Sequence, residues 1–497
     1  MVRDVVIGAA VKSTLTSIKM ARENVDKASE RLATGLRVNR ATDNPQNFFQ
    51  SYKLNATANN FTNLLDKMNL GVRTIQQAIS GVETIENILN LAELKALEAK
   101  EALEKTGSNL SNLILDNQPI GYFQLYDSDE SPTAQNLGNA GAVLADGIYT
   151  NGVTQGNEIL FYGAGGKPAK LDGTNQFIEV PVDPLINLGG PFDERTVELI
   201  FNAETVAGRQ VLWEEGGSTN SMNIYIDNGR LYVNGRTTSG GGYGPLDIST
   251  PIQAGKSYHV AFTQQGGSPT VDGRFTGYLN GVAFGSEVIN GTIGNHPNRN
   301  AIGGIAQNVY FHDDGPGNAP ARGDGTFAFN GQISDVAVYN DVLTQEDMRA
   351  RYEATSLPLA ESFRKDMQVF LEQIQGIVDD TSYRGINLLD KEELLVNFND
   401  QNTSKLRVKG EAFSLEDLNL ENIDFQKPSQ VRDAIINIRK ALNKVRDFGT
   451  GLSVDLNIIQ TRQDFTRNFI NNYKSGAEDL VIADQNAEGA KLLSAQT

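Results

Sequence analysis

Apolar residues recur at alternating steps of four and three through a long stretch of the first hundred residues. From residue 54 onward they are Leu54, Ala58, Phe61, Leu65, Met68, Val72, Ile75, Ile79, Val82, Ile85, Leu89, Ala92, Ala96, Ala99 and Leu103. A repeat sustained over this many turns predicts a coiled-coil seam rather than the stripe of a short globular helix. The extra step of three between Val82 and Ile85 is a stammer, which overwinds the seam locally. At 1.5 Å per residue this helix would be about 75 Å long.

Other helical stripes lie on both sides of this repeat. A shorter one covers residues 11–32 and ends before a break at Asn44-Pro45. Near the C-terminus, one stripe covers residues 363–377, and another begins after Pro428 and continues through Phe465 to Leu480. Proline is favoured in the first turn of a helix, which supports the second start. Because one helix cannot bury so long a seam alone, we expect the two terminal arms to pack against each other.

The middle of the chain differs from both arms in composition and in period. Of the 49 glycines, 38 lie between Gly107 and Gly331, together with all three histidines and the single tryptophan. Short β-rich runs alternate there with the turn pairs Asn228-Gly229, Asn234-Gly235 and Asn280-Gly281. Many short strands with tight turns predict a jelly roll. The expected fold class is multidomain α+β, with a long antiparallel coiled-coil bundle formed by both termini and an inserted all-β jelly-roll sandwich.

Composition excludes several classes of function. With 61 Asp+Glu against 43 Lys+Arg, the net charge of −18 argues against a nucleic-acid partner. The absence of cysteine excludes a disulfide scaffold, a thiol nucleophile and any cysteine-ligated metal. No run of eighteen apolar residues is present, so we expect no membrane insertion. The apolar residues 5–11 lack the basic lead and cleavage site of a signal peptide, so we expect export without a cleaved leader.

Catalysis is not expected either. Glycoside hydrolases need two carboxylates that flank the scissile bond, and the strand pattern Glu-x-Asp-x-x-Glu does not occur. Glu198 and Glu204 come nearest to it, while Glu214 and Glu215 are adjacent and would point to opposite faces of a strand. The tripeptide 322–324, Arg-Gly-Asp, carries too little information to indicate an integrin ligand. We therefore predict a protein that is not an enzyme.

The two arms carry paired motifs that resemble bacterial flagellin. The N-terminal motif is Glu30-Arg31-Leu32-Ala33-Thr34-Gly35-Leu36-Arg37-Val38-Asn39, followed by Asp43-Asn44-Pro45; the C-terminal motifs are Gln460-Thr461-Arg462-Gln463-Asp464-Phe465-Thr466 and Glu488-Gly489-Ala490. Residues 43–49 and 386–389 are most similar to flagellins of the alphaproteobacterial type. By this resemblance, a further helix would be expected beyond the segment that ends at Thr497.

The middle resembles a second family, the laminin-G-like jelly roll of the concanavalin A lectin/glucanase fold. The matching segments are residues 114–123, 171–173, 258–262, 278–281 and 331–336. The resulting division is 1–109 for the N-terminal flagellin helices, 110–356 for the surface-exposed jelly roll, and 357–497 for the C-terminal helices. Alternating apolar residues also predict a β-hairpin near 394–409 within the last part.

The resemblance implies a structural subunit that polymerises into the bacterial flagellar filament for motility and is located outside the cell. The implied partners are other copies of the chain, the flagellar type III export apparatus, the filament cap, hook-associated proteins and an export chaperone. A carbohydrate ligand of the insert is a further possibility. Two alternatives stay open: a flagellar hook–filament junction protein, and a secreted lectin-type adhesin that uses its helices to oligomerise.

Candidate site residues follow from the same resemblance. The expected subunit contacts are Arg31, Leu32, Gly35, Leu36, Arg37, Asn39, Asp43, Ile75, Ile79, Gln460, Arg462, Asp464 and Phe465. No cofactor is required, although relatives of the jelly roll hold calcium, and Asp172 and Asp335 are the implied ligands. Aromatic side chains that could line a sugar face are Trp213, Tyr225, Tyr232, Tyr243 and His259, of which His259 is expected to be structural.

Overall fold

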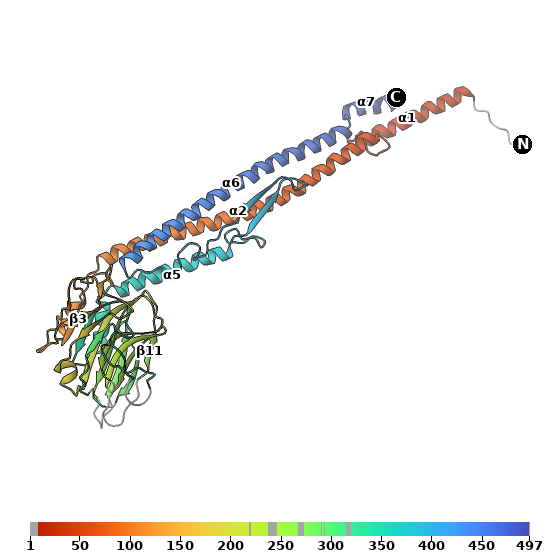
Figure 1. Cartoon of the computed structure of the whole chain (residues 1–497). Helices are drawn as coiled ribbons and strands as arrows, with labels where there is room; N and C mark the ends of the chain where they lie inside the picture. The colour runs from red at the N-terminus through yellow and green to blue at the C-terminus, as the bar shows by residue number, and fades with distance from the viewer. Residues whose placement is uncertain are drawn as a thin grey trace. The chain divides into compact units, whose positions relative to one another are not determined.

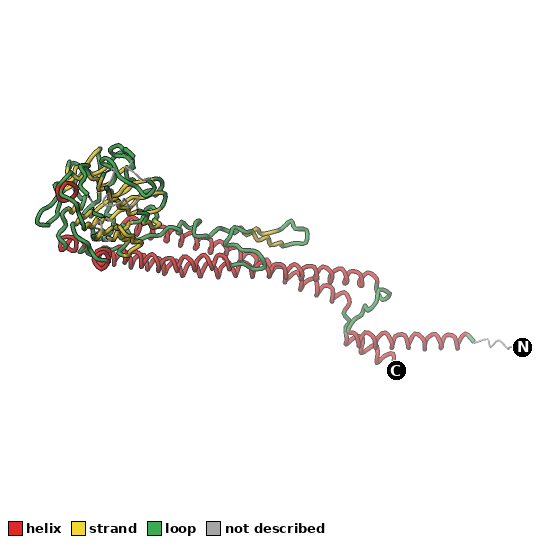
Figure 2. The backbone as a smooth tube through the Cα atoms, turned by 90° about the horizontal axis from the view of Figure 1, so that it is seen from below, coloured by secondary structure: helices red, strands yellow, loops and turns green. Residues whose placement is uncertain are grey.

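A computed structural model describes residues 8–217, 220–236, 246–266, 273–289, 291–292, 294–314 and 320–496. The chain divides into two compact units. The helical unit comprises Met1–Ile88, Gln373–Leu418 and Ala441–Thr497, and the sandwich unit comprises Leu89–Glu372 and Asn419–Lys440. The helices are drawn as coiled ribbons in Figure 1 and in red in Figure 2, and the strands gather in the sandwich unit apart from one hairpin. The division at residues 109 and 356 stays a prediction.

Seven α-helices and one π-helix are present among the described residues. They are α1 (Ala9–Thr34), α2 (Pro45–Glu104), α3 (Leu110–Asp116), η1 (Pro184–Leu188), α4 (Gln345–Glu353), α5 (Leu357–Asp380), α6 (Pro428–Val481) and α7 (Gln485–Gln496). Local sequence explains several boundaries. Gly35 ends α1 because it takes φ 73°, and Asn44 caps α2 by accepting a hydrogen bond from Asn47 N at 3.0 Å. The capping box of Thr344 and Asp347 starts α4.

The coiled-coil seam is confirmed. Along α2, the side chains of Met68, Ile75, Ile85 and Leu89 have essentially no exposed surface. Helix α6 runs antiparallel to α2 in the helical unit. Residues that come later along α2 contact residues that come earlier along α6. These contacts are Glu86–Arg446 at 2.7 Å, Asn69–Gln463 at 2.8 Å and Phe61–Phe469 with ring centroids 6.0 Å apart.

One part of the predicted seam is wrong. The stripe on α6 passes through Phe465 in the sequence prediction, but that side chain is 53% exposed. Gln463, Thr466 and Ile470 are buried in its place. Polar side chains occupy the seam there because Gln463 finds a partner in Asn69 and Thr466 Oγ1 donates to its own helix at Arg462 O. Periodicity based on apolar residues alone cannot detect such a shift.

The predicted hairpin is present beside α2. Strand β17 (Glu393–Asn397) pairs with β18 (Lys405–Lys409) in antiparallel register. A Cβ on Gly71 of α2 would lie 2.7 Å from Val396 Cγ2, so only glycine allows the hairpin to approach this closely. The small residue therefore fixes where the hairpin packs.

Two eight-stranded antiparallel sheets form the jelly-roll sandwich. The first has the order β14-β13-β12-β7-β16-β5-β4, with β1 paired to β16, and the second has the order β11-β10-β9-β8-β15-β6-β3-β2. The strands of the first are β1 (Gly121–Phe123), β4 (Thr154–Gln155), β5 (Ala169–Asp172), β7 (Glu194–Ala203), β12 (Ser257–Gln265), β13 (Gly273–Leu279), β14 (Val282–Ile289) and β16 (Asn330–Tyr339). Those of the second are β2 (Thr133–Ala134), β3 (Gly147–Thr150), β6 (Phe177–Val180), β8 (Arg209–Gly216), β9 (Ser221–Asp227), β10 (Arg230–Arg236), β11 (Ile248–Pro251) and β15 (Asn300–Ile302).

Alternate residues of the two sheets meet in one core, which includes Val197, Leu199, Phe201, Trp213, Ile224 and Phe262. The turns predicted at Asn228 and Asn280 exist, with φ of 46° and 52°. The turn predicted at Asn234-Gly235 is wrong, because both residues lie inside β10. Gly235 is there for space, since a Cβ would stand 2.9 Å from the ring of Phe275.

Candidate functional site

The N-terminal motif of residues 30–45 lies where α1, the loop before α2 and the end of α6 meet. Arg31 forms a 3.2 Å ion pair with Glu488 of α7, and Leu36 makes a β-bridge with Ile482. Arg37 donates to Val481 O and Leu480 O at 2.6 and 3.3 Å. These predicted interface residues therefore hold the two ends of the chain together within one molecule.

Asp43 fixes the loop that follows. Its carboxylate accepts hydrogen bonds from the backbone N–H groups of Arg40 and Asn39 at 2.8 and 2.9 Å, which hold the pKa of Asp43 below its ordinary value. Asn39 also donates from Nδ2 to Leu36 O at 3.3 Å. The loop geometry is thus set by its own side chains, while contacts of this loop with another subunit stay a prediction.

The remaining predicted interface residues divide between seam and surface. Ile75 is buried in the seam and Leu32, Gly35 and Ile79 are half-buried, whereas Gln460, Arg462, Asp464 and Phe465 lie on the exposed face of α6. Arg462 lies over the ring of Phe398, 5.4 Å from its centroid. Asp464 pairs with Arg467 at 2.9 Å. The structure does not bring these two sets together.

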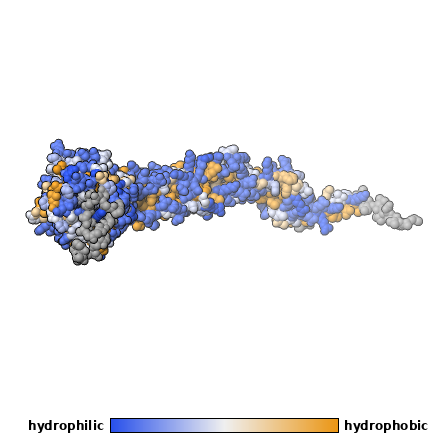
Figure 3. All heavy atoms as spheres, turned by 60° about the horizontal axis from the view of Figure 1, so that its bottom comes forward, coloured by the Kyte–Doolittle hydropathy of each residue, from blue (hydrophilic) through white to orange (hydrophobic). Residues whose placement is uncertain are grey.

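Apolar side chains on two helices lack a cover in the described chain. On α1 they are Val11, Leu15 and Ile18, each about 60% exposed and spaced so that they share one face. On α6 they are Val454, Ile458 and Phe465. Val454 and Ile458 border a shallow groove together with Asn457, Thr461 and Arg462. Apolar patches are visible among the hydrophilic residues of the helical part in Figure 3. Exposed apolar stripes of this kind mark protein–protein contacts.

The two aspartates implied as calcium ligands lie apart. Asp172 is exposed on β5 and accepts hydrogen bonds from Thr174, whereas Asp335 is buried and accepts from the hydroxyls of Tyr122 and Tyr126 at 2.8 and 2.6 Å. Burial raises the pKa of Asp335. Asp172 pairs with Asn330, five residues before Asp335 along β16, a separation of about 16 Å. The pair could not share one ion in this conformation, and calcium binding stays a prediction.

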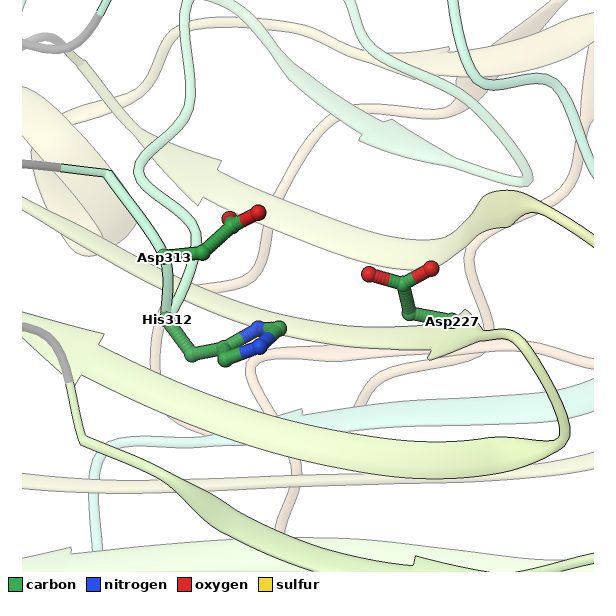
Figure 4. A group of neighbouring side chains, drawn as sticks. All are labelled: Asp227, His312 and Asp313. Carbon is green, nitrogen blue, oxygen red and sulfur yellow. The ribbon is translucent and has the colours of Figure 1, made fainter.

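A different group of side chains has the spacing of a metal site, but an arginine side chain already pairs with its carboxylates. Ligand atoms of Asp227, His312 and Asp313 lie within 4.8 Å of one another, and Figure 4 shows both carboxylates and the imidazole around one gap. Arg209 forms ion pairs with Asp227 at 2.5 Å and with Asp313 at 2.8 Å. His312 Nδ1 is bound to the hydroxyl of Tyr225 at 2.6 Å. The guanidinium thus supplies the positive charge that a metal would supply.

Most of the aromatic candidates for a sugar face belong to the core. Trp213, Tyr225 and His259 are buried, and Tyr243 lies outside the described residues. Tyr232 is buried as well, in a small cluster with Tyr225 and Phe311, but its ring stacks on the partly exposed His312 at 4.2 Å between centroids. His259 is structural, as predicted: its Nε2 lies 2.9 Å from Glu198 Oε2 between two strands of the first sheet.

Glu198 is the centre of a buried polar network that covers the outer side of the first sheet. Its carboxylate accepts from Arg351 Nε at 2.8 Å and from the Tyr339 hydroxyl at 2.6 Å, in addition to His259. Burial opposes ionisation, but Arg351, His259 and Tyr339 outweigh it and hold the pKa of Glu198 below its ordinary value. Sequence reasoning missed this group because Glu198 and Arg351 are 153 residues apart. The network joins α4 to the sheet.

Glu214 and Glu215 point to opposite faces of β8, as predicted. Glu215 pairs with the buried Arg195 at 2.9 Å between the two sheets, and Glu214 accepts from Ala306 N at 3.4 Å. Burial raises the pKa of both carboxyls. Because each side chain has its own surroundings, the two do not form a pair of cooperating carboxylates.

The Arg-Gly-Asp segment is held by the fold. Arg322 forms a buried ion pair with Asp314 at 2.7 Å, and Asp324 pairs with Arg299 at 2.5 Å. Arg322 also lies over the ring of Phe311, 4.6 Å from its centroid. Its guanidinium is therefore unavailable to a receptor, which agrees with the low weight given to this tripeptide.

His296 gives a testable pH dependence. It is 4% exposed, and burial together with the Arg195 guanidinium lowers its pKa from 6.5 to about 4. Between these values the unfolded chain binds more protons than the folded one, so stability should fall as pH drops from 6.5 to 4. The loss should approach about 3 kcal/mol at 1.36 kcal/mol per pKa unit. Urea unfolding followed by Trp213 fluorescence at pH 7 and 4.5 measures it.

The control is His296→Gln, which stays neutral across this pH range. Glu215 also lies beside Arg195 and is present in both proteins, so the difference between them isolates the histidine. Equal loss of stability in both proteins between pH 7 and 4.5 would contradict the assignment.

These features define a class of protein that combines long antiparallel helices with a jelly-roll sandwich. Residues 8–111 match the family model of the bacterial flagellin N-terminal helical region, and residues 172–349 match that of the concanavalin A-like lectin/glucanases superfamily. The chain therefore contains a flagellin N-terminal helical region and a concanavalin A-like domain. No curated protein matches the chain. No described helix is long and apolar enough to cross a membrane.

Several solved structures are similar to part of this chain. Domain 4 of AbnA, a GH43 extracellular arabinanase from Geobacillus stearothermophilus solved with arabinotriose, is 16% identical and matches over 47% of this chain and 98% of that one, with a TM-score of 0.31. The receptor binding domain of botulinum neurotoxin D is 12% identical over 48% and 53%, with a TM-score of 0.34. The binding domain of Paraclostridial Mosquitocidal Protein 1 is 14% identical over 48% and 52%, with a TM-score of 0.34. The chain spans about half the length of these last two.

Proposed function

We propose that this chain is a flagellin of the alphaproteobacterial type, a structural subunit that polymerises into the flagellar filament for motility. The observation that carries the proposal is the uncovered apolar stripe on α1, within the region that matches flagellin. A second copy of the chain would bury this stripe. The other partners of the proposal are the type III export apparatus, the filament cap, hook-associated proteins and an export chaperone, and its location is extracellular.

Burial of the stripe supplies favourable energy for assembly. Val11, Leu15 and Ile18 each expose about 60% of their surface, and a fully buried side chain of this size contributes about 1.5–3 kcal/mol. The α1 stripe and the α6 stripe are different surfaces, so contact between them would be head-to-tail. A head-to-tail contact that does not close produces a filament instead of a ring.

Assembly should depend on this stripe. Replacing Val11, Leu15 and Ile18 with serine should abolish filaments while the single chain keeps its fold, because these side chains have no cover in the described chain. Electron microscopy of the purified proteins measures this, with circular dichroism as a check on folding. The matched control is Lys12→Ser with Lys19→Ser on the same helix, which should still form filaments.

Electron microscopy also separates the alternatives. Long filaments of the wild-type chain support the filament subunit. Short caps or rings that need a second flagellar protein would favour the hook–filament junction protein. Discrete oligomers of an adhesin, with glycan binding, would favour the lectin-type alternative. Filaments from the serine variant would contradict the role assigned to α1.

We also propose that the jelly roll binds carbohydrate. The favouring observation is the partly exposed rim at His312, where an imidazole stacked on Tyr232 lies beside Asp227 and Asp313. Aromatic rings with adjacent carboxylates suit a sugar, which has an apolar face and hydroxyl donors. A glycan array with the full chain, with and without chelator, tests both this role and calcium. His312→Ala should weaken binding at least about tenfold, the equivalent of 1.4 kcal/mol. The matched control is Asp129→Asn, and absence of binding to every sugar would refute the proposal.

A further inference from the structure

Helix α6 begins against the sandwich, inside the sandwich unit. The residue before its first turn is Lys427, whose carbonyl accepts the first helical hydrogen bond from Val431 N at 3.2 Å. A residue at this position usually caps the helix, because a serine, threonine, aspartate or asparagine side chain accepts from the free N–H groups of the first turn. A lysine side chain has no acceptor. The sequence at the start of α6 therefore lacks its own cap.

Glu158, in the loop between β4 and β5, supplies the cap. Its carboxylate accepts from the backbone N–H of Ser429 at 3.1 Å and from the Ser429 hydroxyl. Two neighbouring backbone positions need no distant acceptor. Pro428 has no N–H, and the N–H of Lys427 donates to Gln430 Oε1 at 2.9 Å. A carboxylate is favoured here also because the helix dipole is positive at this end. Residues 158 and 429 are 271 positions apart.

The segment before α6 is fixed to the same sandwich. The side-chain amide of Gln426 pairs with both backbone groups of Ser257, accepting from its N–H at 2.7 Å and donating to its carbonyl at 3.3 Å. The Ser257 hydroxyl in turn donates to Leu160 O at 2.9 Å, in the loop that carries Glu158. Phe425 is fully buried, with its ring 6.4 Å from that of Phe363 on α5.

We infer that the jelly roll and residues 419–440, which include the start of α6, fold as one unit. Glu158 caps α6 and Gln426 binds the start of β12, so residues 419–440 become ordered only when the sandwich is folded. Residues 419–440 belong to the same compact unit as residues 89–372, as this coupling requires. The inference goes beyond the proposed function, since it holds whether or not the chain polymerises. It also implies that excision of residues 113–354 removes the cap of α6 along with the insert.

Hydrogen exchange of the full-length chain tests the cap. Glu158→Ala should accelerate exchange of the amides in 429–440 about tenfold, as expected for loss of a helix cap, and leave 455–475 unchanged. Glu158→Gln keeps an acceptor oxygen without the charge and should give an intermediate effect. The control is Glu130→Ala, an exposed glutamate of the same sandwich, which should change neither region. Wild-type exchange of 429–440 in Glu158→Ala would overturn the capping role.

A second variant tests the coupling itself. Ile224→Ala removes buried core of the sandwich, and the single, fully buried Trp213 reports whether the sandwich is folded. As urea is raised, protection of 429–440 should be lost at the same concentration as the native Trp213 fluorescence, and at a lower concentration than in the wild type. Protection of 429–440 that outlasts the Trp213 signal would show an independent stem and overturn the inference.

Discussion

Replacing Ile75 and Ile79 with aspartate is expected to abolish assembly and unfold much of the helical unit. Ile75 has no exposed surface and lies in the α2 seam opposite α6. An unpaired carboxylate at this position would either lose its hydration or take up a proton, and loss of the isoleucine itself removes about 2–5 kcal/mol of stability. Urea unfolding followed by circular dichroism at 222 nm, together with electron microscopy, measures both effects.

The matched control places the same charges one residue from Ile75 and two residues from Ile79. Gln76 and Gln77 are exposed on the same turn of α2, so Gln76→Asp with Gln77→Asp should leave helix content near that of the wild type. Filaments formed by the Ile75→Asp, Ile79→Asp protein would contradict the seam. Loss of filaments in the glutamine control as well would attribute the effect to charge on α2 rather than to burial.

Arg351→Met should destabilise the sandwich by about 3–5 kcal/mol, because it leaves the Glu198 carboxylate buried without its ion-pair partner. The Nε–Oε1 distance is 2.8 Å and both side chains are almost entirely buried. The lowered pKa of Glu198 also predicts how the stability of the wild type depends on pH. The stabilisation by this ion pair is present above about pH 4.5 and is lost as pH falls through the folded pKa. Urea unfolding followed by Trp213 fluorescence measures the change.

A double substitution separates the lost charge from lost packing. Glu198→Gln combined with Arg351→Met should recover part of the stability, since no uncompensated charge is then buried. Arg349→Met is the control, because Arg349 is exposed on the same helix and pairs with the neighbouring Glu346 and Glu353. If the double variant is no more stable than Arg351→Met, the ion pair does not explain the effect.

The sequence predicts the helical seam well because period and burial have the same cause. Positions such as Ile75 and Ile85 combine correct spacing with complete burial. Leu15 and Ile18 have the same kind of spacing but remain exposed. The spacing indicates a helix face that packs against a partner, but it does not show whether the partner belongs to the same chain or to another. Phe465 fails for a related reason: the polar Gln463 and Thr466 fill the seam, and an apolar pattern does not register them.

The polar sites could not be predicted because their partners are distant in sequence. Nothing near Glu198 points to Arg351, and nothing near Lys427 points to Glu158. Asp172 and Asp335 were paired by resemblance, yet the hydroxyls of Tyr122 and Tyr126 occupy the carboxylate of Asp335. Spacing determines local structure, whereas the assignment of charges to partners depends on the complete topology of the two sheets.

The uncovered stripe on α1 also determines how growth of a polymer would begin. An isolated helix is marginal in water, and Val11, Leu15 and Ile18 gain no burial from the described part of their own chain. The first two copies to meet would gain few contacts, whereas each later copy would meet a surface that is already formed. We therefore expect a lag phase, a sharp critical concentration, and removal of the lag by preformed filament fragments used as seeds.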